Sequence, residues 1–340
     1  MPLGLILLVL TAVLLISITL GISIGPVQIP FVDVWKIGMY KIGFIEAGDW
    51  ARSHENIVWL IRFPRVIMGV FVGAGLSVVG VTLQALVRNP LADPYLLGIS
   101  SGASVGAVLV LGLGFLALAG IYAVSIGAFL GAMLAFVLVF AIAQQRGHVT
   151  PQRLILAGLA ISYVFSGITS YITLTSDDRD LAGDVLSWTL GSLAHADWID
   201  LTLPALVLVI GTIYLVLQSR KLNALIMGDE TAATLGIDVM AFRRQLFVVS
   251  SLITGVMVAV AGAIGFIGLM IPHVVRLLTG SNHQRVLPIS LFLGAIFLIW
   301  VDVFARTAFA PTELPVGVIT SMLGGPFFLW LMRSAGKQRG

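Results

Sequence analysis

The chain contains no cysteine and very little charge. Without cysteine among its 340 residues, it can form neither structural disulfides nor thiolate metal sites. Only 10% of the residues are Asp, Glu, Lys or Arg, whereas a soluble globular protein carries about 25% charged residues. Hydrophobic residues make up 59%, and the mean hydropathy is +1.06. The chain has too few charged residues to surround a hydrophobic core with a water-exposed surface, so we expect an integral membrane protein in contact with the lipid bilayer.

Two further absences narrow the function. No G-x-x-x-x-G-K-[ST] phosphate loop occurs, so we expect no ATP hydrolysis by this chain and assign no catalytic residue. The 19 Lys and Arg residues are scattered near the ends of apolar runs, which excludes a nucleic-acid-binding face. The N-terminal segment 1–25 has no basic start, and its apolar stretch is longer than the core of a signal peptide. It therefore predicts a first membrane span.

Further apolar runs predict the other spans, each needing about 20 residues to cross the hydrocarbon core. The stretch 94–145 holds two spans, broken near Gly112–Gly114. The remaining clear spans lie at 66–87, 154–176, 201–218, 286–305 and 314–332. The stretch 245–275 is ambiguous. It forms either one long helix, or a span followed by a short helix at 266–279 that turns back near Gly262–Gly265.

The positions of Lys and Arg decide between nine and ten spans, because short cytoplasmic loops carry an excess of both. With the N-terminus inside and ten spans, most of the 19 basic residues lie inside and most of the 16 acidic residues outside. Nine spans would place Arg333 and Lys337 outside. We therefore expect an all-α membrane protein with ten transmembrane helices in a single domain over 1–340, and with both termini cytoplasmic.

A faint internal repeat accompanies these spans. The segments 69–98 and 255–288 each run through a Gly-rich helix with an Arg and a Pro break into a new span. In the ten-span arrangement the first segment begins on the outer side of the membrane and the second on the inner side. This predicts inverted repeats of the kind found in transporters, formed by spans 2–5 and 7–10. The alternative is that Gly-rich membrane helices resemble one another, because small residues let helix backbones approach closely.

The segment 88–103, RNPLADPYLLGISSGA, is a polar break between apolar runs. Pro90 and Pro94 end the preceding helix, since each lacks an N–H group and restricts the residue before it. Asn89 and Asp93 can satisfy the freed backbone groups, and Gly98 opens a thin, hydroxyl-bearing helix start. Irregular backbone at membrane depth survives only inside protein or beside a cavity, so the sequence predicts a structured, protein-buried break.

Three polar residues within apolar runs have competing interpretations. Gln84, one turn before Arg88, is expected to form a hydrogen bond between helices. Asp302, the only carboxylate well inside a predicted span, is a functional candidate by default, but an i,i+4 pair with Arg306 is favoured. His273, beside Pro272, is expected to form a hydrogen bond at a helix terminus rather than to bind haem iron, because no second His lies nearby. No metal site is assigned.

Seven motifs in a fixed order resemble the FecCD family, the permease subunits of type II ABC importers for iron-siderophores, haem and cobalamin. The resemblance covers 55–333 and implies the ten-helix permease fold in the bacterial cytoplasmic (inner) membrane. The motifs are RFPR at 62–65, RNPLADPYLLGISSGA at 88–103, WTLGSL at 188–193, LNALIMGDETAATLG at 222–236, GFIGLMIPHVVRLLTG at 265–280, DVFAR at 302–306 and ELPVGVITSMLGGPFF at 313–328.

The inside loop 219–244 is longer than a connection between spans needs to be. Asp229 is a suitable helix N-cap, 231–235 can form a short helix, and Gly236 suits its C-terminal stop. The resemblance implies that this loop holds the coupling helices, which sit in a groove of the ATPase subunit. The alternative is an amphipathic surface loop. The coupling residues implied are Leu222, Asn223, Leu225, Gly228, Asp229, Glu230, Ala232, Leu235 and Gly236.

Three arginines, Arg62, Arg65 and Arg306, fall at the outer face of the ten-span arrangement. By itself, each is typical of an interfacial side chain whose charge reaches water. The resemblance implies that they pair with glutamates of a substrate-binding protein. Guanidinium groups suit this role because they are always charged and grip carboxylates bidentately.

The fifth span carries a row of hydroxyl groups. Spacings of 3, 4 and 7 put Ser162, Ser166, Thr169 and Thr173 on one side of the helix, with Ser170 beside them. The resemblance places this helix next to a central channel, where a weakly polar lining would let a bulky ligand pass. Helix packing by small residues is the alternative interpretation.

The resulting hypothesis is a permease subunit that moves an iron chelate, haem or a corrinoid by ATP-driven alternating access. Its expected partners are a second permease copy, two ATPase subunits and a periplasmic or lipid-anchored substrate-binding protein. No cofactor is expected on this chain, since ATP and Mg²⁺ belong to the ATPase. One rival is an ion-coupled secondary carrier, which tends to place several ionisable residues near the midplane. A second rival is a non-transporting scaffold.

Overall fold

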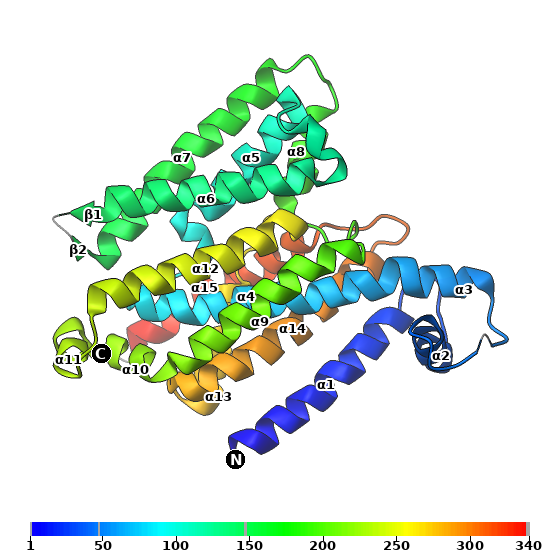
Figure 1. Ribbon diagram of the computed structural model, residues 1–340, viewed down its shortest axis with the longest axis horizontal. Helices are drawn as coiled ribbons and strands as arrows, with labels where there is room; N and C mark the ends of the chain where they lie inside the picture. Colours follow the sequence, from blue (N-terminus) through cyan, green and yellow to red (C-terminus); the bar gives the residue numbers. More distant parts are fainter. Residues whose placement is uncertain (1, 47, 146–147, 338–340) are drawn as a thin grey trace.

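The computed structural model describes residues 2–46, 48–145 and 148–337, and helices dominate it (Figure 1). Residues 1, 47, 146–147 and 338–340 of the predicted domain lie outside this description. The α-helices are α1 (Leu3–Ser23), α2 (Phe31–Lys41), α3 (Arg52–Asn56), α4 (Phe63–Val87), α5 (Ile99–Leu113), α6 (Ala123–Ala143), α7 (Pro151–Thr175), α8 (Leu181–Leu190), α9 (Thr202–Leu217), α10 (Ser219–Met227), α11 (Asp229–Thr234), α12 (Val239–Ala261), α13 (Ile267–Thr279), α14 (His283–Thr307) and α15 (Val316–Lys337).

Short elements connect the helices. A π-helical turn, η1 (Ile57–Arg62), joins α3 to α4, and two short antiparallel strands lie between α6 and α7. The 3₁₀ turns are η2 (Pro94–Leu97), η3 (Ala117–Tyr122) and η4 (Ile199–Leu201), and the strands are β1 (Gln144–Gln145) and β2 (His148–Val149).

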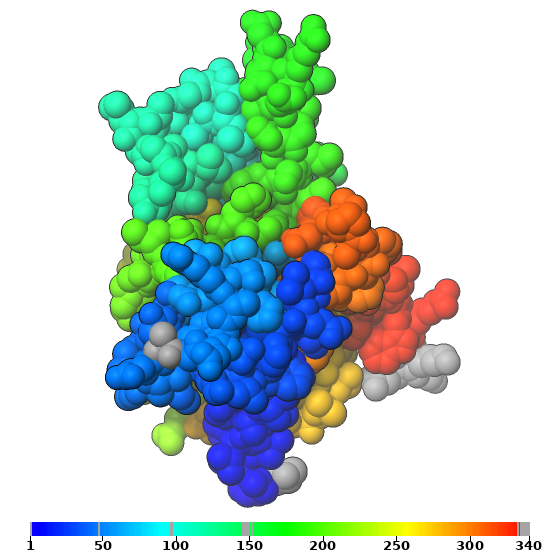
Figure 2. All heavy atoms as spheres, turned by 90° about the vertical axis from the view of Figure 1, so that its right-hand side faces the viewer, coloured from blue at the N-terminus to red at the C-terminus, as the bar shows by residue number. Residues whose placement is uncertain are grey.

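The helices form two groups, visible in Figure 1 and again as separate lobes in the end-on view of Figure 2. In the larger group α4 is the central helix and packs against α9, α12, α13 and α14. In the smaller group α5 packs against α6, α7 and α8. Contacts of α12 with α5 and α6 join the two groups. The buried core follows this plan, because α4 is buried along nearly its whole length.

Glycines allow the closest helix contacts, as the Gly-rich sequence predicts. A Cβ atom on Gly73 of α4 would collide with the carbonyl group of Gly294 of α14, and one on Gly80 would collide with that of Gly268 of α13. Within a membrane no hydrophobic effect drives helices together, so close backbone packing contributes much of their association. Any larger residue at Gly73 or Gly80 must push α4 away from its neighbours.

The predicted count of ten spans is not confirmed. In the described part of the chain, seven helices are long and apolar enough to cross a membrane. Three further apolar helices, Ile99–Leu113, Ile267–Thr279 and Val316–Leu331, are shorter. The break near Gly262–Gly265 is confirmed, since α12 ends at Ala261 and α13 begins at Ile267. The break at Gly114 is confirmed as well, because this residue ends α5 with a φ of 65°.

The second predicted span begins earlier than expected. Its helix runs without interruption from Arg52 to Val87, whereas the sequence predicts a span from 66 with the RFPR motif at its start. Pro64 lies inside this helix and cannot donate a hydrogen bond to the preceding turn. The π-helical turn η1 shifts the hydrogen-bond register just before this proline, which lets the helix continue through it.

The helices of the two predicted repeats pack against each other in a reciprocal way. In the first, α4 is followed by a break and then by α5, α6 and α7; in the second, α12 is followed by a break and then by α13, α14 and α15. The first helix of each set packs against the third helix of the other, α4 against α14 and α12 against α6. Inverted repeats would produce this reciprocal packing of the first and third helices. The presence of such repeats stays a prediction.

Candidate functional site

The polar break between α4 and α5 is a tightly hydrogen-bonded turn. Arg88 ends α4 in the left-handed region, with a φ of 50°. The side-chain oxygen of Asn89 accepts a hydrogen bond from the backbone N–H of Leu91, and that of Asp93 accepts one from the N–H of Tyr95, both at 2.9 Å. Gly98, with a φ of 74°, ends η2 and starts α5. The predicted satisfaction of the break by Asn89 and Asp93 is confirmed.

A groove of about 410 Å³ lies between α5, α7 and α8, next to this break. Its lining is rich in hydroxyl groups, and we call it the hydroxyl groove. It includes four of the five hydroxyl residues that the sequence predicts on the fifth span; Thr173 is not among the lining residues. The lining residues are Tyr95, Ser100, Ser101, Ser104, Ser162, Ser166, Thr169, Ser170 and Thr189.

Several groove hydroxyls donate their protons to their own helices. Ser101 donates to the carbonyl of Gly98 at 3.0 Å, Ser104 to that of Ser100 at 3.1 Å, and Ser162 to that of Gly158 at 2.8 Å. Such hydroxyls keep their lone pairs as acceptors. The groove is therefore a neutral, weakly polar surface, which favours brief contacts with a solute over tight binding.

Asp93 adds a buried carboxyl group beside the groove. Its side chain is 7% exposed, and within the described residues its Oδ2 atom has no hydrogen-bond partner. Burial raises the pKa of Asp93 from 3.8 to about 6, against the lowering effect of the hydrogen bond from Tyr95. The native state therefore binds this proton more tightly than the unfolded chain does.

We expect the Asp93→Asn variant to lose a pH dependence of stability. Between pH 3.8 and about 6 the native state holds more protons than the unfolded state, so stability falls as the pH rises through this window. The loss is about 3 kcal/mol. Asparagine can still accept the hydrogen bond from Tyr95 but does not titrate. Thermal midpoints in detergent should fall with pH for the wild type and for Asp177→Asn, an exposed control, and less so for Asp93→Asn. An equal fall in all three would contradict the assignment.

The cytoplasmic loop predicted at 219–244 folds into α10, α11 and the start of α12. Gly236, with a φ of 77°, stops α11 as predicted. The predicted N-cap is wrong, because Gly228 occupies this position and Asp229 is the first residue of α11. The side chain of Asp229 is thus free for other partners.

Six of the nine predicted coupling residues are either buried or exposed, and the other three, Asn223, Gly228 and Asp229, are partly exposed. Leu222, Leu225 and Ala232 are fully buried and hold α10 and α11 onto the bundle. Glu230, Leu235 and Gly236 are exposed, together with Met227, which the sequence did not single out. The exposed residues and the side chain of Asp229, which is 44% exposed, offer a surface to a partner, whereas the buried residues are already covered.

Asp229 binds two arginines from different helices. Its Oδ1 atom lies 2.6 Å from Nη2 of Arg88 and 2.9 Å from Nη2 of Arg243. Arg88 is the first residue of the polar break and caps α4, whereas Arg243 lies in the second turn of α12. Asp229 therefore connects α11, α4 and α12.

Asn223 ties α10 to the start of α14. Its side-chain oxygen accepts a hydrogen bond from the backbone N–H of His283 at 2.9 Å, and its Nδ2 donates to Oδ1 of Asn282 at 3.1 Å. Asn282 caps α14 by accepting a bond from the N–H of Gln284. Asn223 thus serves the internal structure of this region.

Gln84 forms the hydrogen bond between helices that the sequence predicts, and the structure shows why it is needed. Pro272 lies inside α13 and has no N–H to donate to the carbonyl of Gly268, four residues earlier. Nε2 of Gln84 donates to that carbonyl at 3.0 Å, and its Oε1 accepts a hydrogen bond from Arg276 of α13. Gln84 therefore replaces a helix hydrogen bond that Pro272 removes.

His273 is not at a helix terminus, contrary to the prediction. It lies in the middle of α13, where its ring contacts the ring of Phe327 edge-on, with centroids 5.8 Å apart. The part of the chain that the structure describes contains no cluster of three or more metal-ligating residues.

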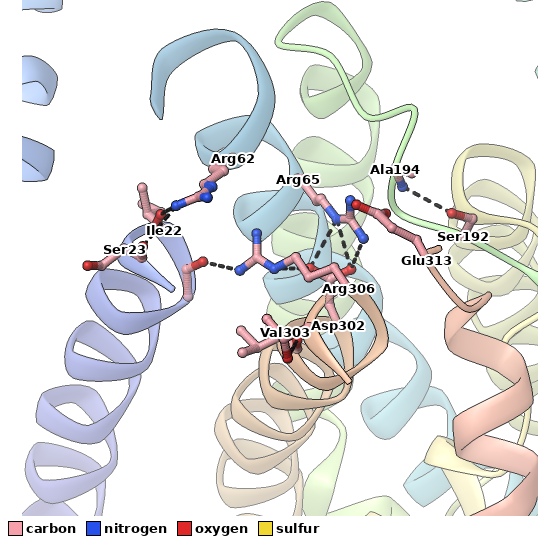
Figure 3. Close-up of polar contacts among 12 residues, drawn as sticks. Ile22, Ser23, Arg62, Arg65, Ser192, Ala194, Asp302, Val303, Arg306 and Glu313 are labelled. Carbon is pink, nitrogen blue, oxygen red and sulfur yellow. Dashed lines mark hydrogen bonds and ion pairs between the residues drawn. The ribbon is translucent and has the colours of Figure 1, made fainter. Parts of the chain in front are cut away.

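An ion cluster lies at the other end of the bundle (Figure 3). Nε of Arg65 donates to both carboxylate oxygens of Asp302, at 2.9 and 3.1 Å, and Nη1 of Arg65 lies 2.8 Å from Oε2 of Glu313. The favoured i,i+4 pair of Asp302 with Arg306 is present but longer, at 3.8 Å. The principal partner of Asp302 is therefore Arg65, on another helix.

The three arginines predicted at the outer face are buried, which corrects their expected surface position. Arg62 and Arg65 are each 4% exposed and Arg306 is 2% exposed. Arg62 donates to the backbone carbonyls of Ile22 and Ser23 at 2.9 and 2.8 Å, which fixes the C-terminal end of α1. Arg306 also bonds α1, through the carbonyl of Gly21. These guanidinium groups hold helices together in this conformation.

Two features of the candidate site could not be predicted from the sequence. Glu313 opens a recognised motif, yet nothing local indicates that it pairs with Arg65, 248 residues away. The serines of α5 join those of α7 in the hydroxyl groove, whereas the Gly-Ile-Ser-Ser-Gly run by itself predicts only a thin helix start. Both features depend on which helices lie side by side.

Comparison with known proteins gives consistent results along the chain. Residues 13–334 match the FecCD transport family. The hemin transport system permease protein HmuU of Yersinia pestis is 41% identical over 296 residues, which cover 85% of this chain and 88% of that protein. The cobalamin import system permease protein BtuC of Halobacterium salinarum is 41% identical over 282 residues, 83% of this chain and 74% of that one. The Fe(3+)-citrate import system permease protein YfmD of Bacillus subtilis is 38% identical over 322 residues, 94% and 92%.

A solved structure supports the same relationship. A chain assigned to the metal-chelate type of ABC transporter, in an inward-facing conformation, superposes with a TM-score of 0.84. The match covers 97% of this chain and 99% of that chain, at 28% sequence identity. Sequence and fold agree over nearly the whole length, so this chain belongs to the FecCD transport family.

Proposed function

We propose that the chain is the permease subunit of a binding-protein-dependent ABC importer for an iron chelate, haem or a corrinoid. The observation that carries this proposal is the family match over 13–334, with relatives that are permeases for hemin, cobalamin and Fe(3+)-citrate. The three relatives differ in substrate at similar identity, so the proposal extends to this group of large metal chelates and tetrapyrroles.

The hydroxyl groove is the proposed wall of the pathway. Ser166 and Ser170 of α7 are exposed, so the groove is open along this helix. A second copy of the chain, placed against this side, would close the groove into a central channel. A channel lined by hydroxyl oxygens without charge suits bulky chelates, because it offers many weak contacts and no tight one.

The ten-span arrangement completes the proposal. The seven long helices and the three shorter apolar ones give ten crossings if the short ones span with help from their neighbours. The start of α1 and the end of α15 lie toward the end of the molecule that carries α10 and α11 (Figure 1). In this orientation that end is cytoplasmic, within the inner membrane of a bacterium.

The loop 219–244 is the proposed contact with the ATPase subunit, with one such subunit for each permease copy. Met227 and Leu235 are 71% and 66% exposed, which makes them apolar contacts on a surface that lies outside the proposed bilayer. Apolar side chains in such a position are typical of a protein interface. ATP and Mg²⁺ belong to the ATPase partner.

Docking of a substrate-binding protein at the opposite end stays a proposal. Arg65 is the arginine best placed for it, because its partner Glu313 is 40% exposed and lies toward the outside. A glutamate of the docking protein could replace Glu313 at Nη1 of Arg65 while Asp302 keeps the other side of the guanidinium. Arg62 and Arg306 would have to leave backbone carbonyls of α1 to do the same.

Transport in proteoliposomes tests the proposal. The chain is reconstituted with its co-expressed ATPase, and binding proteins loaded with haemin, cyanocobalamin or ferric citrate are supplied outside. Uptake of one of these ligands should require ATP inside and should stop when the ATPase is omitted. Uptake driven by a proton or sodium gradient without the ATPase would instead identify an ion-coupled carrier and refute the proposal.

A further inference from the structure

We propose that Asp229 transmits movement of α11 to the polar break, by holding the guanidinium of Arg88. This inference rests on the proposed function, because it assumes that an ATPase moves α11. It assigns Asp229 and Arg88 a positioning role inside the permease, which differs from contact with the ATPase itself.

The first step of the transmission is the ion pair between α11 and the end of α4. Nη2 of Arg88 lies 2.6 Å from Oδ1 of Asp229, a short charge-assisted contact. Nη2 of Arg243 reaches the same oxygen at 2.9 Å, and the Arg243 side chain is buried. Two cations on one carboxylate make Asp229 the central member, since its removal leaves the two guanidiniums facing each other.

The second step is the backbone around Arg88. The N–H groups of Arg88 and Asn89 bond the carbonyls of Ala85 and Gln84, which ties the start of the break to the last turn of α4. Arg88 itself holds a left-handed conformation, with a φ of 50°, that few side chains adopt. A pull on its guanidinium therefore moves the start of the break and the last turn of α4 together.

The third step runs from the break to the hydroxyl groove. The turn from Asn89 to Asp93 leads to Tyr95, which lines the groove. Gly98 touches α7 directly: a Cβ atom there would lie 3.2 Å from the carbonyl oxygen of Gly158 and 3.4 Å from Oγ of Ser162. The break thus lies between α11 and the helix that carries the groove hydroxyls.

A second set of hydrogen bonds, from Gln84 to α13, prevents the last turn of α4 from moving by itself. Gln84 bonds both the carbonyl of Gly268 and the guanidinium of Arg276, so α13 is joined to α4 one turn before Arg88. Movement of α11 therefore reaches α13 as well as α5 and α7. α10 also packs against both α11 and α4, but of the ion pairs described, the Asp229–Arg88 pair is the one that joins α11 to the start of the break, which makes it the element to test.

The test measures transmission without a transported ligand. A single cysteine is introduced at Ser166 of the groove, which is specific because the chain has no cysteine of its own. The complex with the co-expressed ATPase is treated with ATP and vanadate, and the rate of labelling by a maleimide is compared with that of the nucleotide-free complex. ATPase attachment is measured on the same samples by co-purification.

The Asp229→Asn and Arg88→Ala variants should keep the ATPase attached. Their nucleotide-dependent change in labelling rate should be smaller than that of the parent complex by roughly fivefold or more, the usual range of coupling between sites. Asp229→Glu, which keeps the carboxylate, should restore the response. Arg244→Ala removes an exposed neighbouring charge and should respond as the parent does.

Three outcomes would overturn the inference. One is a full response in Asp229→Asn, and another is loss of ATPase attachment in this variant, which would make Asp229 a docking residue. The third is failure of Asp229→Glu to restore the response although the complex remains intact. If the parent complex itself shows no response to nucleotide, the proposed function fails, and the transmission role fails with it.

Discussion

Asp302→Ala is expected to destabilise the protein by about 3–5 kcal/mol, the usual effect of removing one partner from a buried ion pair. The side chain of Asp302 is 1% exposed, and it faces Arg65 at 2.9 Å and Arg306 at 3.8 Å. Without it, two buried guanidinium groups retain only Glu313 and a backbone carbonyl as partners. The thermal midpoint in detergent should drop strongly, and the C-terminal end of α1 should become accessible to protease.

Glu313→Ala is the matched control for this prediction. Its carboxylate contacts the same arginine at 2.8 Å but is 40% exposed, so water can replace it. Exposed pairs contribute at most about 1 kcal/mol, and the thermal midpoint should change little. Equal effects of the two variants would show that the burial of Asp302 does not determine the stability of the cluster.

Replacing residues 228–235 by a flexible Gly/Ser linker is expected to abolish attachment of the ATPase. The linker removes α11 with its exposed residue Glu230 and the exposed Leu235 that follows it, and it leaves the apolar spans unchanged. Transport that depends on the ATPase should then disappear completely. Co-purification of the ATPase with the permease, together with the elution profile of the permease in detergent, measures both parts of the result.

Point variants make the same test without shortening a helix. Leu235→Asp places a charge on an apolar side chain that is 66% exposed, so the fold should tolerate it while the interface should not. Leu118→Asp, in η3 between α5 and α6, changes an apolar residue that is fully exposed and is the control. If the ATPase stays bound at full strength to Leu235→Asp and to the linker variant, this loop is not the coupling site.

Local features of the sequence predicted local structure well. Proline and glycine restrict backbone geometry wherever they occur, so the breaks at Pro90, Gly114 and Gly262 could be placed without knowing any tertiary contact. The early start of the helix that contains Pro64 was missed for the converse reason. A π-helical turn can absorb a proline, and no residue type marks such a turn in advance.

The polar partners were harder to predict. Arg65 and Asp302 are 237 residues apart, and Arg88 and Asp229 are 141 apart. A charged side chain in a membrane protein must find a partner, but several partners compete within its own helix and loop. The nearest one in sequence, Arg306 for Asp302, proved to be the longer contact.

By itself, the sequence determined that this chain lies in a membrane, where its helices break, and to which family it belongs. These properties follow from apolar run length, from the restricted geometry of proline and glycine, and from motifs that are continuous in the chain. Tertiary structure alone decided that the three arginines predicted at the outer face are buried, that Gln84 replaces the hydrogen bond removed by Pro272, and that serines of α5 and α7 form one groove. Those facts depend on which helices pack together, since a side chain's partner and burial are properties of its neighbours in space.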